Sequence, residues 1–170
     1  MMAQAVMAPK ESRWQRWLVA PVVAQLTVGT SPERLGWTIA LGIVLGVFPI
    51  LGMPTLVCLL AGYSLRLNQP VIQVFKELVY PFHLVLIPVF IRLGECLFGV
   101  PQTSFSIPDL LGRFKNDPLQ FGRDFGMTAC HAVIVWLLIA PFAAILIQWG
   151  VTPVMRKLAL SIQKRREANG

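Results

Sequence analysis

The amino-acid sequence predicts an all-α, polytopic membrane protein with a proline- and glycine-broken helical hairpin followed by two kinked spanning helices. Of its 170 residues, 55% are hydrophobic and only 14% are charged, whereas a soluble domain usually carries about 25% charged residues. No charged residue occurs between Arg34 and Arg66, and none occurs between Asp124 and Arg156. Both stretches exceed the ~20 residues that a helix needs to cross a bilayer, so both are predicted to enter the membrane.

Residues 1–30 are expected to form a basic and aromatic segment at the membrane interface. Arg13 and Arg16 share one helix face, whereas Trp14 and Trp17 occupy another. Tryptophan together with arginine is typical of helices at the lipid headgroups. The apolar stretch that follows is short, so a shallowly buried segment is the alternative. Because no uninterrupted apolar core precedes the first charges, we expect the later apolar segments to drive insertion.

The predicted membrane domain, residues 31–157, opens with a hairpin over residues 31–67. Ser31 is a good N-cap and Pro32 fits a first helical turn, so a helix should run from here to about Phe48. The stretch FPILGMP then interrupts the apolar run, because proline lacks a backbone donor and clashes with the preceding turn. Each half is about 14 residues, or ~21 Å of helix, which is shorter than the ~30 Å hydrocarbon core. A re-entrant hairpin is favoured, and a continuous kinked span is the alternative.

The rest of the chain divides into segments of contrasting charge and hydropathy. They are a kinked span (70–100), a polar loop (101–124), a second span (125–155) and a basic tail (158–170). Pro81 and Pro88 are the reasons for expecting kinks in the first span. Basic residues concentrate near both chain ends and at the hairpin base, where Arg34 and Arg66 lie. The positive-inside rule therefore predicts a multi-pass protein of the cytoplasmic membrane with both termini in the cytoplasm.

The first part of residues 31–157 contains a series of local motifs. It consists of a proline–glutamate entry, a glycine-bearing helix, a broken proline–glycine turn and an arginine-x-asparagine step. In this chain the residues are Pro32, Glu33, Gly42, Gly46, Pro49, Gly52, Arg66 and Asn68. The stretch that carries them resembles the bacterial integral-membrane family called domain of unknown function 2062. Some members of that family are joined to glycosyltransferase-like domains, so the resemblance implies a connection with lipid-linked sugars.

The break in the hairpin and the ionisable residues after it form the candidate substrate path. Helix ends inside a membrane must face protein or a wet cavity, and in transporters such ends bind substrates or ions. Ionisable residues within a membrane are also functional suspects. The candidates are Phe48, Pro49, Gly52, Pro54, Thr55, Arg66, Asn68, Lys76, Glu77 and His83. The alternative is structural: glycines allow close helix packing, and charged side chains reach the interface.

The leading functional hypothesis is transport or handling of an anionic lipid or lipid-linked intermediate, such as a polyprenyl phosphate, by a homo-oligomer. The alternative is a non-catalytic membrane scaffold or assembly partner, for example for a glycosyltransferase. We expect no catalytic residues, because no nucleophile elbow, HExxH motif or phosphate-binding glycine loop occurs. We also expect no metal, no cofactor and no nucleic-acid partner. Three widely spaced cysteines are predicted to be small buried hydrophobic residues.

Overall fold

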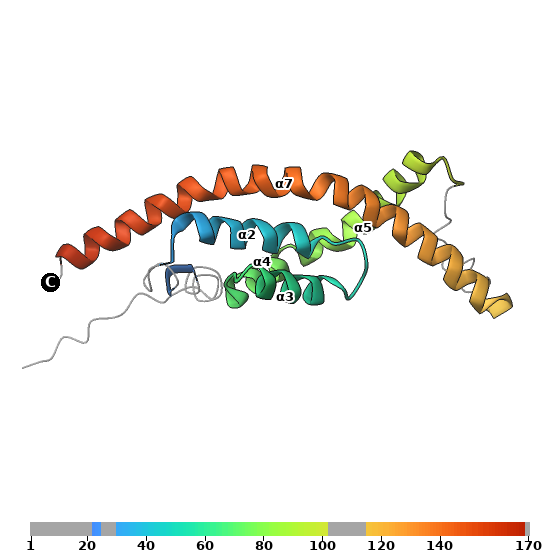
Figure 1. Cartoon of the computed structure of the whole chain (residues 1–170), viewed down its shortest axis with the longest axis horizontal. Coiled ribbons are helices and arrows are strands. Elements are labelled where there is room, and N and C mark those ends of the chain that lie inside the picture. The colour runs from blue at the N-terminus through green and yellow to red at the C-terminus, as the bar shows by residue number, and fades with distance from the viewer. Residues whose placement is uncertain (1–21, 25–29, 102–114, 169–170) are drawn as a thin grey trace, which may run out of the picture.

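The computed structural model describes residues 22–24, 30–101 and 115–168. Within these residues the regular secondary structure is helical throughout, which confirms the all-α prediction. The helices are α2 (Pro32–Gly46), α3 (Pro54–Ser64), α4 (Gln69–Leu78), α5 (Tyr80–Phe98) and α7 (Pro118–Ala168), shown in Figure 1. The predicted N-terminal interfacial segment, apart from residues 22–24 and 30, and most of the predicted polar loop lie outside the described residues.

The broken hairpin consists of α2 and α3, joined by a short turn. Ser31 caps α2 as expected, because its Oγ accepts a hydrogen bond of 3.3 Å from the backbone N–H of Arg34. The helix ends at Gly46, two residues before the expected Phe48. Gly52 adopts a φ of +82° in the turn, a conformation that only glycine reaches without strain. The proline- and glycine-rich stretch is therefore a true chain reversal between two helices.

Where the sequence predicts one kinked span over residues 70–100, the structure contains two helices that meet at Val79. Asn68 caps the first of them, α4, because its Oδ1 accepts a 3.1 Å hydrogen bond from the N–H of Val71. Pro81 lies in the first turn of α5, where a helix tolerates the missing N–H. Pro88 lies inside α5 without ending it. The interruption therefore falls at the first proline and not at the second.

The long helix α7 packs along both α2 and α5 and extends past them at both ends (Figure 1). With 51 residues it is about 76 Å long. It continues through Pro141 and Pro153, so the predicted span and the described part of the basic tail form one helix. At one end of the bundle α7 meets α5, where the rings of His131 and Phe98 stack with centroids 4.3 Å apart. At the other end Arg156 pairs with Glu33 of α2.

The core lies between α7 and the remaining helices. Trp136 is its central residue: the indole N–H donates to the carbonyl oxygen of Val44 over 3.3 Å. The same ring packs edge-on against Phe48 at a centroid distance of 5.0 Å. The hairpin turn is therefore fixed against the middle of α7. Of the three cysteines only Cys58 is buried, whereas the other two are exposed, so the expectation of three buried cysteines is wrong.

Among the described residues, two helices are long and apolar enough to cross a membrane, by length and composition: Tyr80–Phe98 and Gly122–Lys164. In each helix, only 28% of the most apolar 18-residue stretch is buried inside the protein. A core helix of a soluble protein is instead mostly buried. Large apolar side chains instead face outward, including Phe82, Phe142 and Trp149 at 66%, 71% and 70% exposure. This outward-facing apolar surface favours association with a membrane.

Candidate functional site at the hairpin turn

A polar pocket of about 180 Å³ lies where the α2–α3 turn meets the junction of α4 and α5. Its lining residues are Gly46, Gly52, Pro54, Thr55, Lys76, Glu77, Tyr80 and His83. Six of these eight belong to the substrate path predicted from the sequence. The pocket thus gathers residues from four helices and one turn, which span almost forty positions of the chain.

Lys76, near the C-terminal end of α4, is the central charged group of the pocket. Its side chain is only 9% exposed, so its amine needs polar partners. The Nζ atom donates to Oγ1 of Thr55 over 2.8 Å and pairs with Oε1 of Glu77 at 2.5 Å. The Glu77 side chain is 61% exposed, so one end of this ion pair reaches the surface. Neighbours on a helix usually diverge, yet here the long lysine side chain turns back to its neighbour.

Gly46 allows α2 to approach Lys76 closely. A Cβ atom at this glycine would lie 3.1 Å from Cα of Lys76 and 2.6 Å from a methyl carbon of Val79. Any larger residue would therefore push α4 away from the hairpin. The pocket wall depends on this contact, so Gly46 supports the site without supplying chemistry of its own.

His83, fully buried in the first turn of α5, ties that helix to the hairpin turn. Its Nε2 atom lies 2.8 Å from the carbonyl oxygen of Phe48. A carbonyl oxygen only accepts hydrogen bonds, so we assign the proton to Nε2 and a free lone pair to Nδ1. Nδ1 is buried and has no hydrogen-bond partner among the described residues. The ring of Tyr80 lies nearby, with centroids 6.0 Å apart.

The first turn of α3 adds positive electrostatic character to the pocket. Pro54 and Thr55 begin this helix, and Met53 before it makes no side-chain capping hydrogen bond. The first backbone N–H groups of a helix have no intrahelical acceptor and carry a partial positive charge. Together with the amine of Lys76, this helix end favours an anionic or hydrogen-bond-accepting group. Glu77 balances the charge of Lys76.

Four predicted path residues lie outside the lining of the pocket. Phe48 contributes its carbonyl oxygen to His83 and its ring to the core, while Pro49 is buried in the turn. Asn68 caps α4, about 12 Å of helix away from Lys76. Arg66 lies beside it in the α3–α4 connection, where its carbonyl oxygen accepts from Arg34. These last two residues belong to the opposite end of the hairpin.

Two lining residues, Gly46 and Tyr80, were not among the sequence-predicted candidates. Gly46 is the second glycine of a G-x-x-x-G pattern with Gly42, a spacing that favours close helix contact. Tyr80 carries a hydroxyl within an apolar run directly before a proline. Both signals were present in the sequence, but neither indicates a pocket until the α4–α5 junction is known.

The chemistry available in the pocket is binding through hydrogen bonds and charge. Lys76, Thr55 and Tyr80 offer hydrogen-bond donors, and Glu77 offers a carboxylate near the surface. Within the described ranges no group of three or more histidine, cysteine, aspartate or glutamate residues is placed to hold a metal ion. The small volume suits a headgroup-sized moiety.

A family model described as "Uncharacterized protein conserved in bacteria (DUF2062)" matches residues 15–168. This match covers all five of the helices named above and every residue of the pocket. Comparisons with curated proteins and with solved structures found no match.

Proposed function

Because this chain belongs to the DUF2062 family of uncharacterised bacterial proteins, whose description names no activity, we propose a function from its geometry. We propose that it is a multi-pass protein of the inner membrane that handles the polar headgroup of an anionic lipid or lipid-linked intermediate. The observation that carries this proposal is the buried amine of Lys76 in a polar pocket, on helices whose outer surfaces are apolar.

The lengths of the helices support a hairpin that re-enters the membrane. Helices α2 and α3 have 15 and 11 residues, or about 22 and 16 Å, against a hydrocarbon core of ~30 Å. Their turn packs against Trp136, which lies about 30 Å along the α7 axis from Arg156 and about 18 Å from Asp124. The turn thus ends partway along the charge-free stretch of α7.

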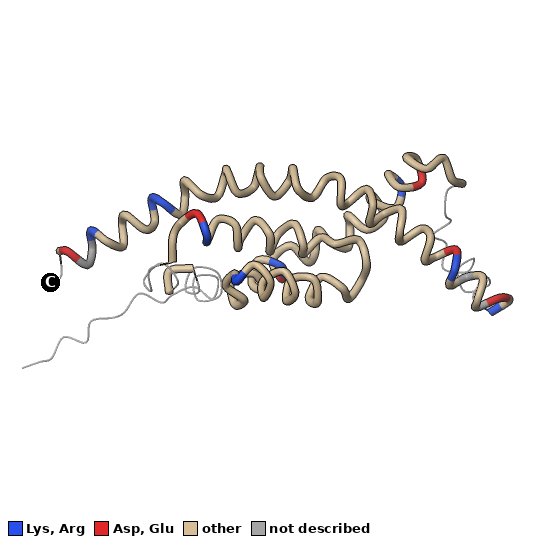
Figure 2. The backbone as a smooth tube through the Cα atoms, in the orientation of Figure 1, with Lys and Arg blue, Asp and Glu red and all other residues tan. Residues whose placement is uncertain are grey.

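The distribution of charge supports the orientation. Figure 2 shows charged residues near both ends of α7 and an uncharged middle. Arg34, Arg66, Arg156 and Lys157 gather at the base of the hairpin. Positive charge of this kind marks the cytoplasmic face. In this orientation the hairpin enters from the cytoplasm, and the C-terminus is cytoplasmic; the N-terminal segment is assigned to the same side.

The pocket offers a way to hold a phosphate away from the aqueous phase. An entering phosphate competes with Glu77 for the amine of Lys76, while Thr55 and the first turn of α3 supply further donors. The pocket rim includes the exposed residue Tyr80, and Leu56 and Phe82 nearby are exposed and apolar. Acyl or prenyl chains can therefore remain in the lipid beside α3 and α5. A homo-oligomer would enclose this path more fully than one copy does.

A lipid-flux measurement tests the proposal. The purified protein is reconstituted into liposomes containing fluorescent phosphatidylglycerol, and transbilayer movement is followed by dithionite quenching. Lys76→Met keeps the length of the side chain and removes its charge, so it should slow movement about tenfold, as expected for the loss of ~1.4 kcal/mol of headgroup binding. Lys157→Met, which removes an exposed charge from α7, is the matched control. The absence of flux in a folded wild-type protein, or equal rates for Lys76→Met and wild type, contradicts the proposal.

The scaffold function is a second candidate, and the form of α7 favours it. The last described part of α7, from Arg156 onward, extends past the other described helices (Figure 1). It is basic and largely exposed, and thus available to a partner membrane protein. Cross-linking followed by co-purification separates the two candidates. A specific partner together with a wild-type protein that moves no lipid favours the scaffold.

A further inference from the structure

A second, larger depression lies at the base of the hairpin, opposite the Lys76 pocket. It is a groove of about 680 Å³, within the size range of small-molecule sites. Its lining residues are Ser31, Glu33, Arg34, Trp37, Leu41, Leu65 and Leu67. They come from the start of α2 and from the α3–α4 connection, so the groove opens at the basic end of the protein.

Arg34, the basic lining residue of this groove, contacts the backbone of Arg66. The Nη2 atom of Arg34 donates to the backbone carbonyl oxygen of Arg66 over 2.6 Å. This contact uses one of the five N–H donors of the Arg34 guanidinium. Arg66 lies between two lining leucines, and within the described part of the chain its side chain has no hydrogen-bond or ion-pair partner. Both guanidinium groups therefore retain donors for a ligand.

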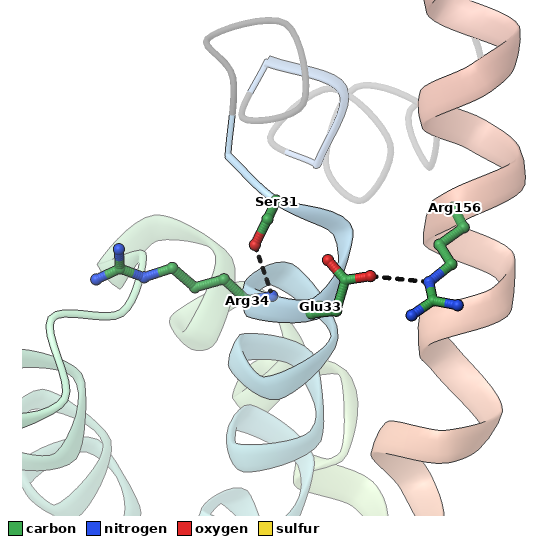
Figure 3. A network of polar contacts seen from close by, with 4 residues as sticks. All are labelled: Ser31, Glu33, Arg34 and Arg156. Atoms are coloured by element: carbon green, nitrogen blue, oxygen red, sulfur yellow. Dashed lines mark hydrogen bonds and ion pairs between the residues drawn. The ribbon is translucent and has the colours of Figure 1, made fainter.

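The one acidic lining residue is neutralised from the other side. Glu33 accepts a hydrogen bond from Nε of Arg156 on α7, at 2.8 Å. Figure 3 shows Glu33 and Arg34 extending to opposite sides of α2, with Glu33 toward α7. Glu33 and Arg156 cancel one another, so Arg34 leaves the lining of the groove with an excess of one positive charge, and Arg66, between two lining leucines, adds a second positive charge to the base of the hairpin. Such an excess is complementary to a phosphate.

The walls of the groove are apolar, and apolar walls favour the binding of a lipid over the binding of a free anion. Trp37 and Leu65 are 38% and 55% exposed, and Leu41 and Leu67 lie half-buried beside them. A tryptophan at this depth is typical of the membrane interface. A soluble phosphate gains nothing from these side chains, whereas the glycerol and upper acyl carbons of a lipid cover them.

We propose that Arg34 and Arg66 bind the phosphate of an anionic glycerophospholipid at the cytoplasmic surface, with its acyl chains lying along Trp37 and Leu65. The inference rests on the membrane placement of the proposed function, but it does not depend on the Lys76 pocket. The lipid in this groove fixes the base of the hairpin at the headgroup level, while the pocket lies deeper.

The test is native mass spectrometry of the full-length protein released from detergent micelles that contain either phosphatidylglycerol or phosphatidylcholine. Arg66→Asn is the informative variant, because Arg66 has a φ of +51° and asparagine tolerates this left-handed conformation. The variant therefore removes the charge without straining the connection. Lys157→Asn removes one charge from α7 at the same end of the bundle and serves as the matched control. We expect Arg66→Asn to lower the occupancy-derived affinity for phosphatidylglycerol about fivefold, and Lys157→Asn to leave it unchanged.

Several outcomes overturn the inference. Equal losses in Arg66→Asn and Lys157→Asn indicate general attraction to the basic end and not a groove site. Equal affinities for phosphatidylglycerol and phosphatidylcholine in the wild type exclude a site selective for anionic lipid. Displacement of the bound lipid by glycerol 3-phosphate at a concentration equal to that of the lipid indicates a free-phosphate site. Lys76→Met measured in parallel separates the two proposals: it should slow lipid flux, which reports on the pocket, and adding Arg66→Asn to this variant should still lower the phosphatidylglycerol affinity about fivefold. If the second substitution has no further effect on that affinity, the groove is not a separate lipid site.

Discussion

The contact between α2 and α4 at Gly42 gives the sharpest prediction about stability. A Cβ atom at Gly42 would lie 2.8 Å from the carbonyl oxygen of Ile72 and 3.1 Å from Cβ of Phe75. To reach an ordinary contact of 3.4 Å, the α4 backbone has to retreat by roughly 0.6 Å. Overpacking of this kind costs about 1–3 kcal/mol. At Gly150 in α7, by contrast, nothing lies within 4 Å of an added Cβ.

The two alanine variants therefore form a matched pair. Alanine gains roughly 1 kcal/mol of helix propensity over glycine at either position, so this gain cancels when Gly42→Ala is compared with Gly150→Ala. The overpacking cost remains. At about 2–4 °C per kcal/mol for a chain of this size, Gly42→Ala should melt roughly 2–12 °C below Gly150→Ala, as followed by intrinsic fluorescence in detergent. Equal melting temperatures, or a higher one for Gly42→Ala, refute the close contact of α2 with α4.

Three further predictions concern named contacts. The pKa of Glu33 is lowered from 4.5 by hydrogen bonding to its own backbone N–H and then by Arg156. Its contribution to stability is therefore full above about pH 4.5 and is lost as the pH falls through the lower folded-state pKa. Glu33→Gln should reduce the loss of melting temperature between neutral pH and roughly pH 3, and an unchanged loss contradicts the pairing. Trp136→Ala should destabilise the protein by about 3–5 kcal/mol, because the indole of Trp136 fills the core against Phe48. A melting temperature within about 1 °C of the wild-type value contradicts this packing. Asn68→Ala should lower the free energy of unfolding by about 1 kcal/mol, because α4 loses its N-cap, and it should leave lipid flux unchanged. A loss of flux at wild-type stability would instead place Asn68 in the substrate path.

Much of the local structure follows from the sequence because it depends on near neighbours. The Ser31 cap, the reversal at Gly52 and the Asn68 cap each require only a few consecutive residues. The pairing of Arg92 with Glu95, at 2.9 Å, is equally local. These features were predictable because capping, turn formation and i,i+3 pairing depend on spacing alone.

The arrangement of the site depends on contacts that spacing does not specify. Lys76 and Thr55 lie 21 positions apart, and His83 reaches a carbonyl oxygen 35 positions away. Arg66 and Asn68 are closer to Thr55 in sequence, but α3 carries them to the other end of the hairpin. The sequence thus identified polar residues in an apolar setting, while the helix packing divided them between the pocket and the opposite end of the hairpin.

The depth of the hairpin turn in the bilayer distinguishes a re-entrant hairpin from a surface hairpin, and spin labels can measure it. A spin label is attached to cysteine introduced at Met53 in the turn or, as the reference, at Leu65 at the hairpin base, after replacement of Cys58, Cys96 and Cys130 by alanine. Accessibility to oxygen, which concentrates in the bilayer, is compared with accessibility to an aqueous nickel chelate in reconstituted liposomes. If the turn lies within the bilayer, the Met53 label favours oxygen over the nickel chelate far more strongly than does the Leu65 label at the headgroup level. A Met53 label as accessible to the nickel chelate as the Leu65 label contradicts a re-entrant hairpin that holds a polar pocket within the membrane.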